Sequence, residues 1–498
     1  MLKEFIVGVY LTVIFLLNIW ALNFLYIFFR FLLICLKNGP FNFNLPTDYF
    51  PMVTIQLPIY NERPDMIRLI LESIYCQSYP KNKIEIVILD QSDDKEIIEA
   101  LKKVVSEFRR RTLMRVSLVF VDRFGTPTDT STQFKAGSLN IATQISHGDI
   151  FVVIDGDSYL DPHYLRNIVP HYSRKEIGLV LPRVVVHRRH KDIFARWVRI
   201  TNHCYFIRNF IESVVGIPVG FLGSGVSLRR EVAEQFCWDT TQEDGCMGYY
   251  ATAVGKWRVW FESKAVVFDE GIIYSLKDGK KKWARLSHGQ CQIIKKMAHD
   301  SENRIQLFTN LQIVIKVVLG PLLPYLLLLL PFLMFFVFYF EISFESWIGI
   351  TLTLFSLLGS TNTFFLVYMV IKYGEVSDLL YYLLLPLNSI VCLVPGVVAF
   401  TGAIFGRKRA FYRVQRVSKN IPTTDTSIKI FEACLAIFFF LLLFIFVYNT
   451  SALIFYATYL VVMVISFTNF RIPPRKPSLE FPINQQVIQS VPNPIDVA

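Results

Sequence analysis

The chain has 498 residues, of which 53% are hydrophobic, and its mean hydropathy is +0.41. This composition is too apolar for an ordinary soluble enzyme, and the length allows one large domain beside a membrane region. The net charge of +11 is placed beside apolar stretches, which is typical of cytoplasmic loops and argues against a nucleic-acid partner. The eight cysteines form no CxxC pair, so we expect a reducing environment and neither a disulfide framework nor a zinc site.

Residues 1–37 are predicted to form an N-terminal transmembrane helix. Residues 5–36 are almost uninterrupted apolar residues, more than the roughly 20 that span a bilayer. No small-residue cleavage site follows, so a signal peptide is not expected. Lys37 after this span predicts that the N-terminus is outside and that the mixed, polar segment 45–275 is a cytoplasmic domain.

The central domain alternates short apolar runs with helical patterns. Strands are predicted at 52–57, 84–89, 116–121 and 150–154; a loop is predicted at 58–62; helices are predicted at 65–77, 95–111 and 135–143. This alternation predicts an α/β fold with a doubly wound, mostly parallel sheet. The first strand is not followed by GxGxxG and the chain contains no GxxxxGK[ST], so neither a dinucleotide-binding motif nor a P-loop is indicated.

Three acidic motifs mark this domain. Asp90 ends the second predicted strand, and Asp155-Gly156-Asp157 ends the fourth, where ligands of such sheets bind. Carboxylate oxygens suit Mg²⁺ or Mn²⁺ beside a phosphate group. Asp244, in Gln242-Glu243-Asp244, is a candidate general base. As alternatives, Asp90 and Asp157 would be helix N-caps, and Glu243 with Asp244 would be an exposed acidic first turn of a helix.

The C-terminal part returns to apolar sequence. Residues 276–318 are predicted to form amphipathic helices at the membrane interface, with Trp283, Leu286, Ile293 and Ile294 toward lipid. Residues 319–470 are predicted to be a transmembrane region, and residues 471–498 a disordered cytoplasmic tail. The apolar stretches are 313–340, 347–371, 378–402, 429–448 and 451–469.

The basic loop 403–428 constrains the topology. Positive charge predicts that this loop is cytoplasmic, so an even number of crossings must separate it from the central domain. Pro386 and Pro395 interrupt the stretch 378–402, which we therefore expect to lie in the interface or to re-enter. The prediction is a multi-pass plasma-membrane protein with five spans, and six is the alternative.

Six motifs in this order resemble the membrane-integrated family 2 glycosyltransferases, the group of cellulose, chitin, hyaluronan and mannan synthases. The resemblance runs from about residue 53 to residue 296. Its motifs are Pro58-Ile59-Tyr60-Asn61-Glu62, Asp90-Gln91-Ser92-Asp93-Asp94, Lys135-Ala136-Gly137-Ser138-Leu139-Asn140, Asp155-Gly156-Asp157, Gly220-Phe221-Leu222-Gly223-Ser224-Gly225 and Gln242-Glu243-Asp244. It implies a GT-A type domain inserted between transmembrane helices.

The resemblance also implies a role for each motif. Donor and nucleotide binding fall to Pro58, Tyr60, Glu62, Asp90, Lys135, Gly137, Asp155 and Arg285. Acceptor binding falls to Phe221, Gly223 and Ser224. Asp157, with Asp155, would hold Mg²⁺ or Mn²⁺, and Asp244 would be the general base of an inverting, single-displacement transfer.

Departures from the family pattern lie mostly after the base. Polymerising members carry Gln-x-x-Arg-Trp, where this chain has Lys282, Arg285 and Leu286. The departure weighs against processive polymerisation and leaves transfer intact; Trp283, one turn earlier, is a partial substitute for the missing Trp. Gln91 stands where the family often has a second Asp. Residues 411–416 resemble a gating loop or, equally, a basic stop-transfer flank.

Three functions compete at this point. The first is transfer of a sugar from a nucleotide-sugar donor to a growing polysaccharide at the membrane, with translocation of the product as an extension. The second is non-processive transfer to a lipid acceptor, which Leu286 favours. The third is an inactive scaffold or transporter, against which the intact Asp90, Asp155, Asp157 and Asp244 argue. The expected partners are a nucleotide sugar, a carbohydrate or lipid acceptor, and membrane lipids.

Overall fold

The computed structural model of the chain describes most of the central domain and parts of the flanking segments. The described residues are 2–38, 45–121, 134–186, 193–220, 223–236, 238, 240, 242–270, 276–299, 312, 315–316, 322, 325–326, 329, 332–333, 335–336, 393–406, 433–438, 440–441, 457 and 460. Phe221, the segment 411–416, the loop 403–428 beyond residue 406, the tail and most of the predicted C-terminal spans lie outside them.

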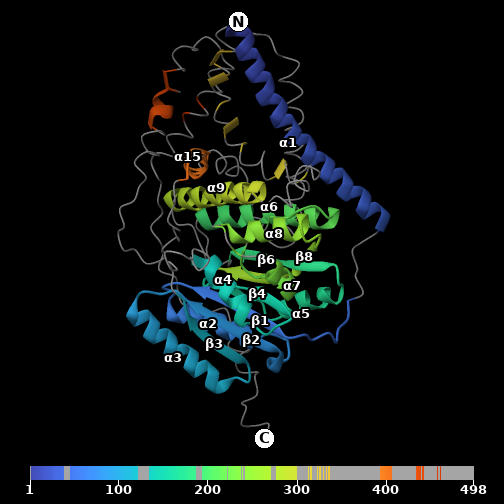
Figure 1. Cartoon of the computed structure of the whole chain (residues 1–498), viewed down its shortest axis with the longest axis vertical. Coiled ribbons are helices and arrows are strands. Elements are labelled where there is room, and N and C mark those ends of the chain that lie inside the picture. The colour runs from blue at the N-terminus through green and yellow to red at the C-terminus, as the bar shows by residue number, and fades with distance from the viewer. Residues whose placement is uncertain are drawn as a thin grey trace.

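A sheet of eight strands forms the middle of the domain (Figure 1). Its order is β3 (Arg115–Phe120), β2 (Ile84–Asp90), β1 (Val53–Ile59), β4 (Ile150–Val153), β7 (Val226–Arg229), β6 (Ile177–Val186), β8 (Arg258–Asp269) and β5 (Ser158–Leu160). Strands β3, β2, β1 and β4 are parallel, as are β6 and β8, whereas β7 and β5 run antiparallel to their neighbours. The α/β prediction is confirmed, and the parallel half is the part that the sequence pattern predicts.

The first helices follow the predicted pattern. They are α2 (Pro64–Tyr75), α3 (Lys95–Arg111) and α4 (Phe134–Ile145). Helix α3 has the predicted bounds because Asp94 caps it, accepting hydrogen bonds from the amides of Glu96 and Ile97. One face of α3 buries Leu101, Val104, Val105 and Phe108, which is the spacing expected of an amphipathic helix.

Strand β1 is longer than predicted, because Pro58 and Ile59 belong to it and not to a loop. Pro58 lacks an amide hydrogen and would normally be excluded from a central strand. It is tolerated here because pairing with β4 ends at Gln56, opposite Val153, while pairing with β2 continues. At Pro58, β1 is therefore no longer paired with β4, and that side of the strand is an edge.

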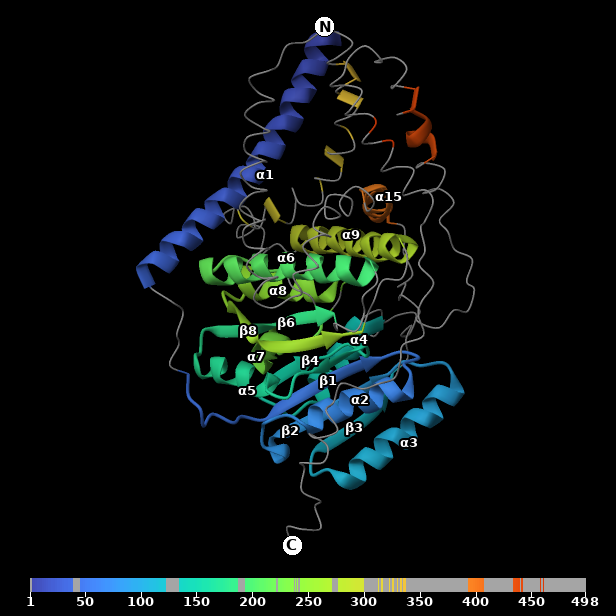
Figure 2. The same cartoon turned by 180° about the vertical axis from the view of Figure 1, so that it is seen from behind.

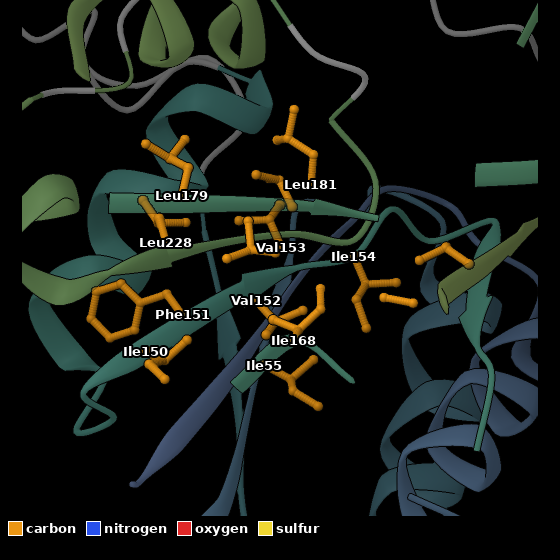
Figure 3. Packing of buried hydrophobic residues seen from close by; sticks show 14 of the residues in the cluster. Ile55, Ile150, Phe151, Val152, Val153, Ile154, Ile168, Leu179, Leu181 and Leu228 are labelled. Carbon is orange, nitrogen blue, oxygen red and sulfur yellow. The ribbon is translucent and has the colours of Figure 1, made fainter. Parts of the chain in front are cut away.

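The core lies between the sheet and its helices. Figure 3 shows side chains of β1, β4, β6 and β7 packed together, among them Ile55, Val152, Leu179 and Leu228. Every residue of β1, β2 and β4 is buried, as expected for parallel strands covered on both faces. The strand ends that follow are thus held on a rigid layer.

The carboxyl ends of β2 and β4 lie on either side of β1. The chain leaves β1 toward β2 and β3 first and returns on the other side as β4, which creates a topological switch point. Asp90 is the last residue of β2, and Asp157 directly precedes β5, so neither is a helix N-cap. That alternative interpretation of the two residues is wrong.

Helices α6 (Ile193–Val215), α8 (Glu243–Ala253) and α9 (Leu276–His299) lie over β6 and β8, away from α2 and α3 (Figure 2). Two shorter helices, α5 (Tyr164–Ile168) and α7 (Arg230–Gln235), also belong to the domain. Helix α9 buries Ile293 fully in the main core. The prediction that Ile293 faces lipid is therefore wrong, because an amphipathic pattern does not tell whether lipid or protein covers the apolar face.

Helix α1 (Leu2–Asn38) packs against α6, where Phe31 meets Phe210 edge to face at 5.6 Å. Its segment Lys3–Lys37 has a mean hydropathy of 2.3 and, among the described helices, alone has the length and apolarity to cross a bilayer. The Nε2 atom of Gln312 donates a hydrogen bond to Oδ1 of Asn23 at 2.5 Å. Lys316 pairs with Glu212 of α6 at 2.7 Å, so the chain beyond α9 also contacts the domain.

Helix α15 (Leu393–Ile404) packs on α9 through Phe400, Ala403 and Cys291. The Lys295 ammonium donates hydrogen bonds to the carbonyls of Ala403 and Ile404 at 2.6 and 3.0 Å. A cation at the C-terminal carbonyls of a helix satisfies them and complements the helix dipole. At 12 residues, α15 is shorter than the roughly 20 residues that a bilayer requires.

Candidate functional site

The loops after β1 and β2 are tied to each other at the carboxyl edge of the sheet. Asn61 adopts a positive φ of 48° and accepts hydrogen bonds from the amides of Asp93 and Asp94, both at 3.2 Å. The side-chain amide of Asn61 donates a hydrogen bond to the Asp93 carboxylate at 2.6 Å, and the Tyr60 hydroxyl donates to the same carboxylate at 3.0 Å. Both loops are therefore fixed before any ligand binds.

Asp90 lies beneath these loops and is only 1% exposed. Its Oδ1 atom accepts a hydrogen bond from the Ser92 amide at 2.9 Å, and its Oδ2 atom has no hydrogen-bond partner among the described residues. Burial raises the pKa of Asp90, and hydrogen bonds with Ser92 oppose that rise. A buried carboxylate oxygen without a partner is costly, so it suits a site where a ligand donor completes it.

Glu62 connects the end of the site around Asp90 to the Asp155-Gly156-Asp157 loop. A Cβ on Gly156 would lie 2.7 Å from both Cγ and Oε1 of Glu62, so only glycine allows this approach. The Asp157 carbonyl accepts a hydrogen bond from the Glu270 amide at 2.9 Å, and the Asp155 carbonyl accepts one from Ser158 at 3.0 Å. The backbone of the loop is thus fixed, and three carboxylates lie near its glycine.

Lys135 joins three elements at the other end of the site. Its ammonium, at the start of α4, lies 2.8 Å from Asp155 Oδ1 and 2.8 Å from Glu243 Oε1. The Lys135 side chain is 17% exposed and that of Glu243 is 8% exposed. Burial would lower the pKa of Lys135, but the charges of Asp155, Glu243 and Asp244 raise it above its ordinary value. The lysine stays charged and holds the donor-side loop against α8.

Asp244 is the second residue of α8, so it forms an acidic first turn with Glu243, but Glu243 is buried and the turn is not exposed as that alternative expected. Loss of hydration on burial and the neighbouring Glu243 raise the pKa of Asp244 to about 7. Lys135, the Gly245 amide and Arg285 act in the opposite direction, and the Gly245 amide donates to Asp244 Oδ1 at 2.7 Å. A carboxylate with such a pKa is well matched to proton abstraction near neutral pH.

The Gly223-Ser224 turn closes over this group. A Cβ on Gly223 would lie 3.0 Å from Asp244 Oδ2 and 3.0 Å from Lys135 Nζ, so a side chain here would displace one of them. The Ser224 hydroxyl accepts a hydrogen bond from the Asp155 amide at 3.3 Å. Gly137 is buried in α4 behind Lys135. The motifs predicted for donor and acceptor therefore meet at one place.

Arg285 is positioned on α9 near enough to influence the charge of Asp244. This brings the predicted diphosphate-facing cation to the reaction end of the site. Lys282 and Leu286 flank Arg285 on the same helix and are half-buried. Leu286, which stands where the family pattern has Trp, directly follows Arg285 on α9.

The carboxylates of Asp155 and Asp157, on either side of Gly156, are the candidate metal ligands. Among the described residues, no cluster of three or more His, Cys, Asp or Glu side chains has a metal-binding arrangement. Mg²⁺ commonly keeps several waters and binds through one or two carboxylates together with substrate phosphates. Asp155 and Asp157, one residue apart on a fixed loop, supply such a donor set, and they fit a divalent cation that arrives with a diphosphate.

Three residues of the predicted motifs, Asn61, Asn140 and Glu243, make contacts that the sequence does not predict. Asn61 ties the loops after β1 and β2 to each other, and Glu243 pairs with Lys135. Asn140 of α4 makes two hydrogen bonds to the backbone of Trp238, at 2.7 and 2.9 Å, and so anchors the segment that leads into α8. The sequence signal for these residues was that each belongs to one of the motifs. Their partners lie 31 to 108 residues away along the chain, so no local spacing predicts the contacts.

Two family models match this chain. Residues 54–235 match the model described as glycosyl transferase family 2, and residues 150–468 match the model described as glycosyl transferase family group 2. The second match covers more than half of the chain. The chain belongs to glycosyl transferase family group 2. It is a glycosyltransferase, and the predictions of family 2 and of the enzyme class are confirmed, whereas membrane integration stays a prediction.

Two curated relatives of this glycosyltransferase are named as glucomannan 4-beta-mannosyltransferases. The chain is 28% identical over 261 residues to glucomannan 4-beta-mannosyltransferase 7 of Arabidopsis thaliana, covering 50% of this chain and 44% of the relative. It is 25% identical over 263 residues to glucomannan 4-beta-mannosyltransferase 1 of Oryza sativa subsp. japonica, covering 51% and 48%. The chain thus spans about half the length of the curated relatives it matches.

A solved structure is also similar to this glycosyltransferase. The mannosyltransferase PcManGT from Pyrobaculum calidifontis, in complex with GDP-Man and Mn²⁺, is 19% identical. The likeness covers 77% of this chain and 99% of that chain, with a TM-score of 0.46.

Proposed function

We propose that this glycosyltransferase moves a sugar, with inversion, from a nucleotide-sugar donor to a growing polysaccharide at a membrane. The observation that carries the proposal is the contact of Lys135 with both Asp155 and Glu243. It brings a strand end suited to a donor diphosphate beside Asp244, a carboxylate suited to abstract a proton. The names of the curated relatives support mannose as the first donor sugar to test.

The donor would lie along the carboxyl ends of β1, β2 and β4. The free oxygen of Asp90 would accept a hydrogen bond from the nucleotide base, next to the loop of Tyr60. Pro58 and Glu62 would border the same pocket. Lys135 and Arg285 would face the diphosphate, whose negative charge they offset. Asp155 and Asp157 would hold Mg²⁺ or Mn²⁺, which supplies further charge neutralisation to the leaving diphosphate.

The acceptor would approach from the Gly223-Ser224 side. Asp244 takes the proton from the acceptor hydroxyl while the oxygen of that hydroxyl bonds to the anomeric carbon of the donor sugar. The bond from that carbon to the phosphate oxygen breaks, and the nucleoside diphosphate leaves with the electron pair. Attack opposite the leaving group inverts the anomeric configuration. A base with a pKa of about 7 is deprotonated for a large share of the time near neutral pH.

The experiment supplies purified, detergent-solubilised protein with radiolabelled nucleotide sugars, Mg²⁺ or Mn²⁺, and membrane lipid extract or β-linked oligosaccharide. GDP-mannose is compared with UDP-glucose, UDP-N-acetylglucosamine and GDP-glucose. We expect labelled polymer or extended oligosaccharide from wild type and at least about 100-fold less from Asp244→Asn. Absence of transfer from every donor, with the protein folded and able to bind nucleotide, would overturn the proposal.

Transfer to a lipid acceptor is the second candidate, and Leu286 favours it. An aromatic side chain stacks on sugar rings, and its replacement beside Arg285 removes one means of holding a polymer. In the same assay this function gives a single labelled product of low mass that partitions into organic solvent. Leu286→Trp would then lengthen the product only if the lost stacking limits processivity.

The membrane setting is part of the proposal. Helix α1 would anchor the enzyme domain, with the domain on the cytoplasmic side, where nucleotide sugars are available. The support is the 35-residue apolar segment Lys3–Lys37 and the packing of α1 on α6. Translocation of a polysaccharide through the C-terminal apolar stretches is an extension of the proposal, and its test is direct detection of labelled polymer inside sealed vesicles.

A further inference from the structure

The Lys135 ammonium is shared by two carboxylates that come from distant parts of the chain. Asp155 follows β4 on the donor side, and Glu243 begins α8 on the acceptor side. Both oxygens lie 2.8 Å from Nζ, and all three side chains are at least partly buried. Because all three groups are at least partly shielded from solvent, this arrangement fixes the start of α8 relative to the loop that contains Asp155.

Among the residues that the structure describes, few other polar contacts fix the first turn of α8. Gln242 occupies the N-cap position and makes no side-chain capping hydrogen bond. Asp244 accepts a hydrogen bond from the amide of its own neighbour, Gly245, and this contact stays within the turn. Glu243 is therefore the residue of this turn whose side chain reaches across to α4.

Charged groups from several elements face Asp244. Glu243 and Tyr249 belong to α8 itself, Lys135 belongs to α4, and Arg285 belongs to α9. Without Glu243, the carboxylate of Asp244 would face two cations and no adjacent negative charge. Glu243 raises the pKa of Asp244, second only to the loss of hydration.

We propose that Glu243 is a positioning residue of the transfer reaction, which holds Lys135 against the donor loop and places a negative charge beside Asp244. The inference rests on the proposed function, because it assigns Asp244 as the base. Glu243 itself touches neither substrate in this assignment. It acts through Lys135 on the donor side and through its charge on the base.

The test compares Glu243→Gln with wild type by measuring kcat/KM for the donor from pH 5 to pH 9. Loss of the charge lowers the pKa of Asp244, so the acidic limb of the profile moves to lower pH by on the order of one unit. At the plateau, kcat falls roughly tenfold or more, because the base is weaker and Lys135 is less constrained. Glu243→Asp keeps the charge on a shorter chain and is expected to lose kcat while keeping the wild-type limb.

Glu234→Gln on α7 is the matched control. That carboxylate is 53% exposed and pairs with Arg230 four residues earlier, so its loss should leave both the profile and kcat unchanged. Thermal unfolding of each variant separates a folding defect from a catalytic one. If wild type transfers sugar and folded Glu243→Gln shows an unshifted limb, this inference is wrong and the proposed function stands. If wild type transfers no sugar from any donor, the proposed function fails instead.

Discussion

The site has two ends that are held by different interactions. We propose the end around Asp90 for the nucleotide, called the nucleotide end, and the end around Asp244 for the transfer, called the reaction end. At the nucleotide end, Asn61 joins two loops by neutral and charge-assisted hydrogen bonds at the surface of the sheet. At the reaction end, the buried ammonium of Lys135 lies between two carboxylates. Hydrogen-bonded loops give a fixed pocket for recognition, whereas buried charges tune the reactivity of a neighbouring group. Damage to each end should therefore have a different signature.

The largest expected effect is at the reaction end. Asp244→Asn removes the base and should lower kcat by about 100- to 10,000-fold while leaving the affinity for nucleoside diphosphate within about twofold. Steady-state kinetics and calorimetric binding measure the two quantities. Asp149→Asn, at the opposite end of β4, is the control and should keep its activity. Equal losses of kcat and nucleotide affinity would remove the distinction between the two ends.

Lys135→Met should affect both stability and rate. It leaves the buried Glu243 and the partly exposed Asp155 without their shared cation, which costs about 1 to 3 kcal/mol of unfolding free energy. The rate should fall on the order of 100-fold, because donor loop and base lose their fixed relation. Lys102→Met, which breaks an exposed pair with Glu99 on α3, is the control for charge removal. A variant of Lys135 with wild-type kcat would show that the ion pairs serve folding alone.

Asp90→Asn should act at the nucleotide end only. The unpartnered Oδ2 atom becomes part of an amide, so a hydrogen bond from the base to a charged acceptor is lost. Such a bond contributes about 1.5 to 3 kcal/mol, which corresponds to at least a tenfold rise in the donor KM. We expect kcat at saturating donor to remain within about threefold. A lower kcat with unchanged donor KM would contradict the assignment of Asp90 to the nucleotide.

The smallest effect is expected for Asn140→Ala. Loss of two hydrogen bonds to the Trp238 backbone should cost about 1 to 2 kcal/mol of stability and lower kcat by about threefold. Asn167→Ala, which removes one exposed hydrogen bond to the Lys264 carbonyl, is the control. Thermal unfolding and kinetics on both variants provide the comparison. A kcat effect equal in both variants would argue that Asn140 has no special link to α8.

The same contrast explains what the sequence could predict. The strand-end position of Asp90 and Asp155 follows from local patterns, because apolar runs of β2 and β4 stop at these residues. The cap alternative for Asp157 failed because β5, a three-residue strand, begins where a helix was considered. The antiparallel strands β7 and β5 have four and three residues and are too short to show an alternating pattern of apolar and polar residues. Pro58 was predicted to lie in a loop. A proline is accepted at this position of β1 only because pairing with β4 ends at Gln56, and the sequence does not show where that pairing ends.

The reaction end depends on long-range contacts. Lys135 and Glu243 are more than a hundred residues apart, so no spacing rule connects them. The resemblance identified Lys135, Gly223 and Asp244 as members of motifs, but not the shared ammonium or the role of Glu243. The burial of Ile293 was also missed, because the amphipathic pattern of α9 fits a lipid surface and a protein surface equally well.

The pH dependence of wild-type kcat/KM for the donor tests the central claim most directly. Asp244 abstracts a proton only in its ionised form, so activity should rise with pH through a midpoint of about 7. The Asp244→Asn variant should lack this limb in its residual activity. A wild-type midpoint near the ordinary aspartate value of about 4, or the same limb in the variant, would contradict the claim that desolvated, charge-flanked Asp244 is the base.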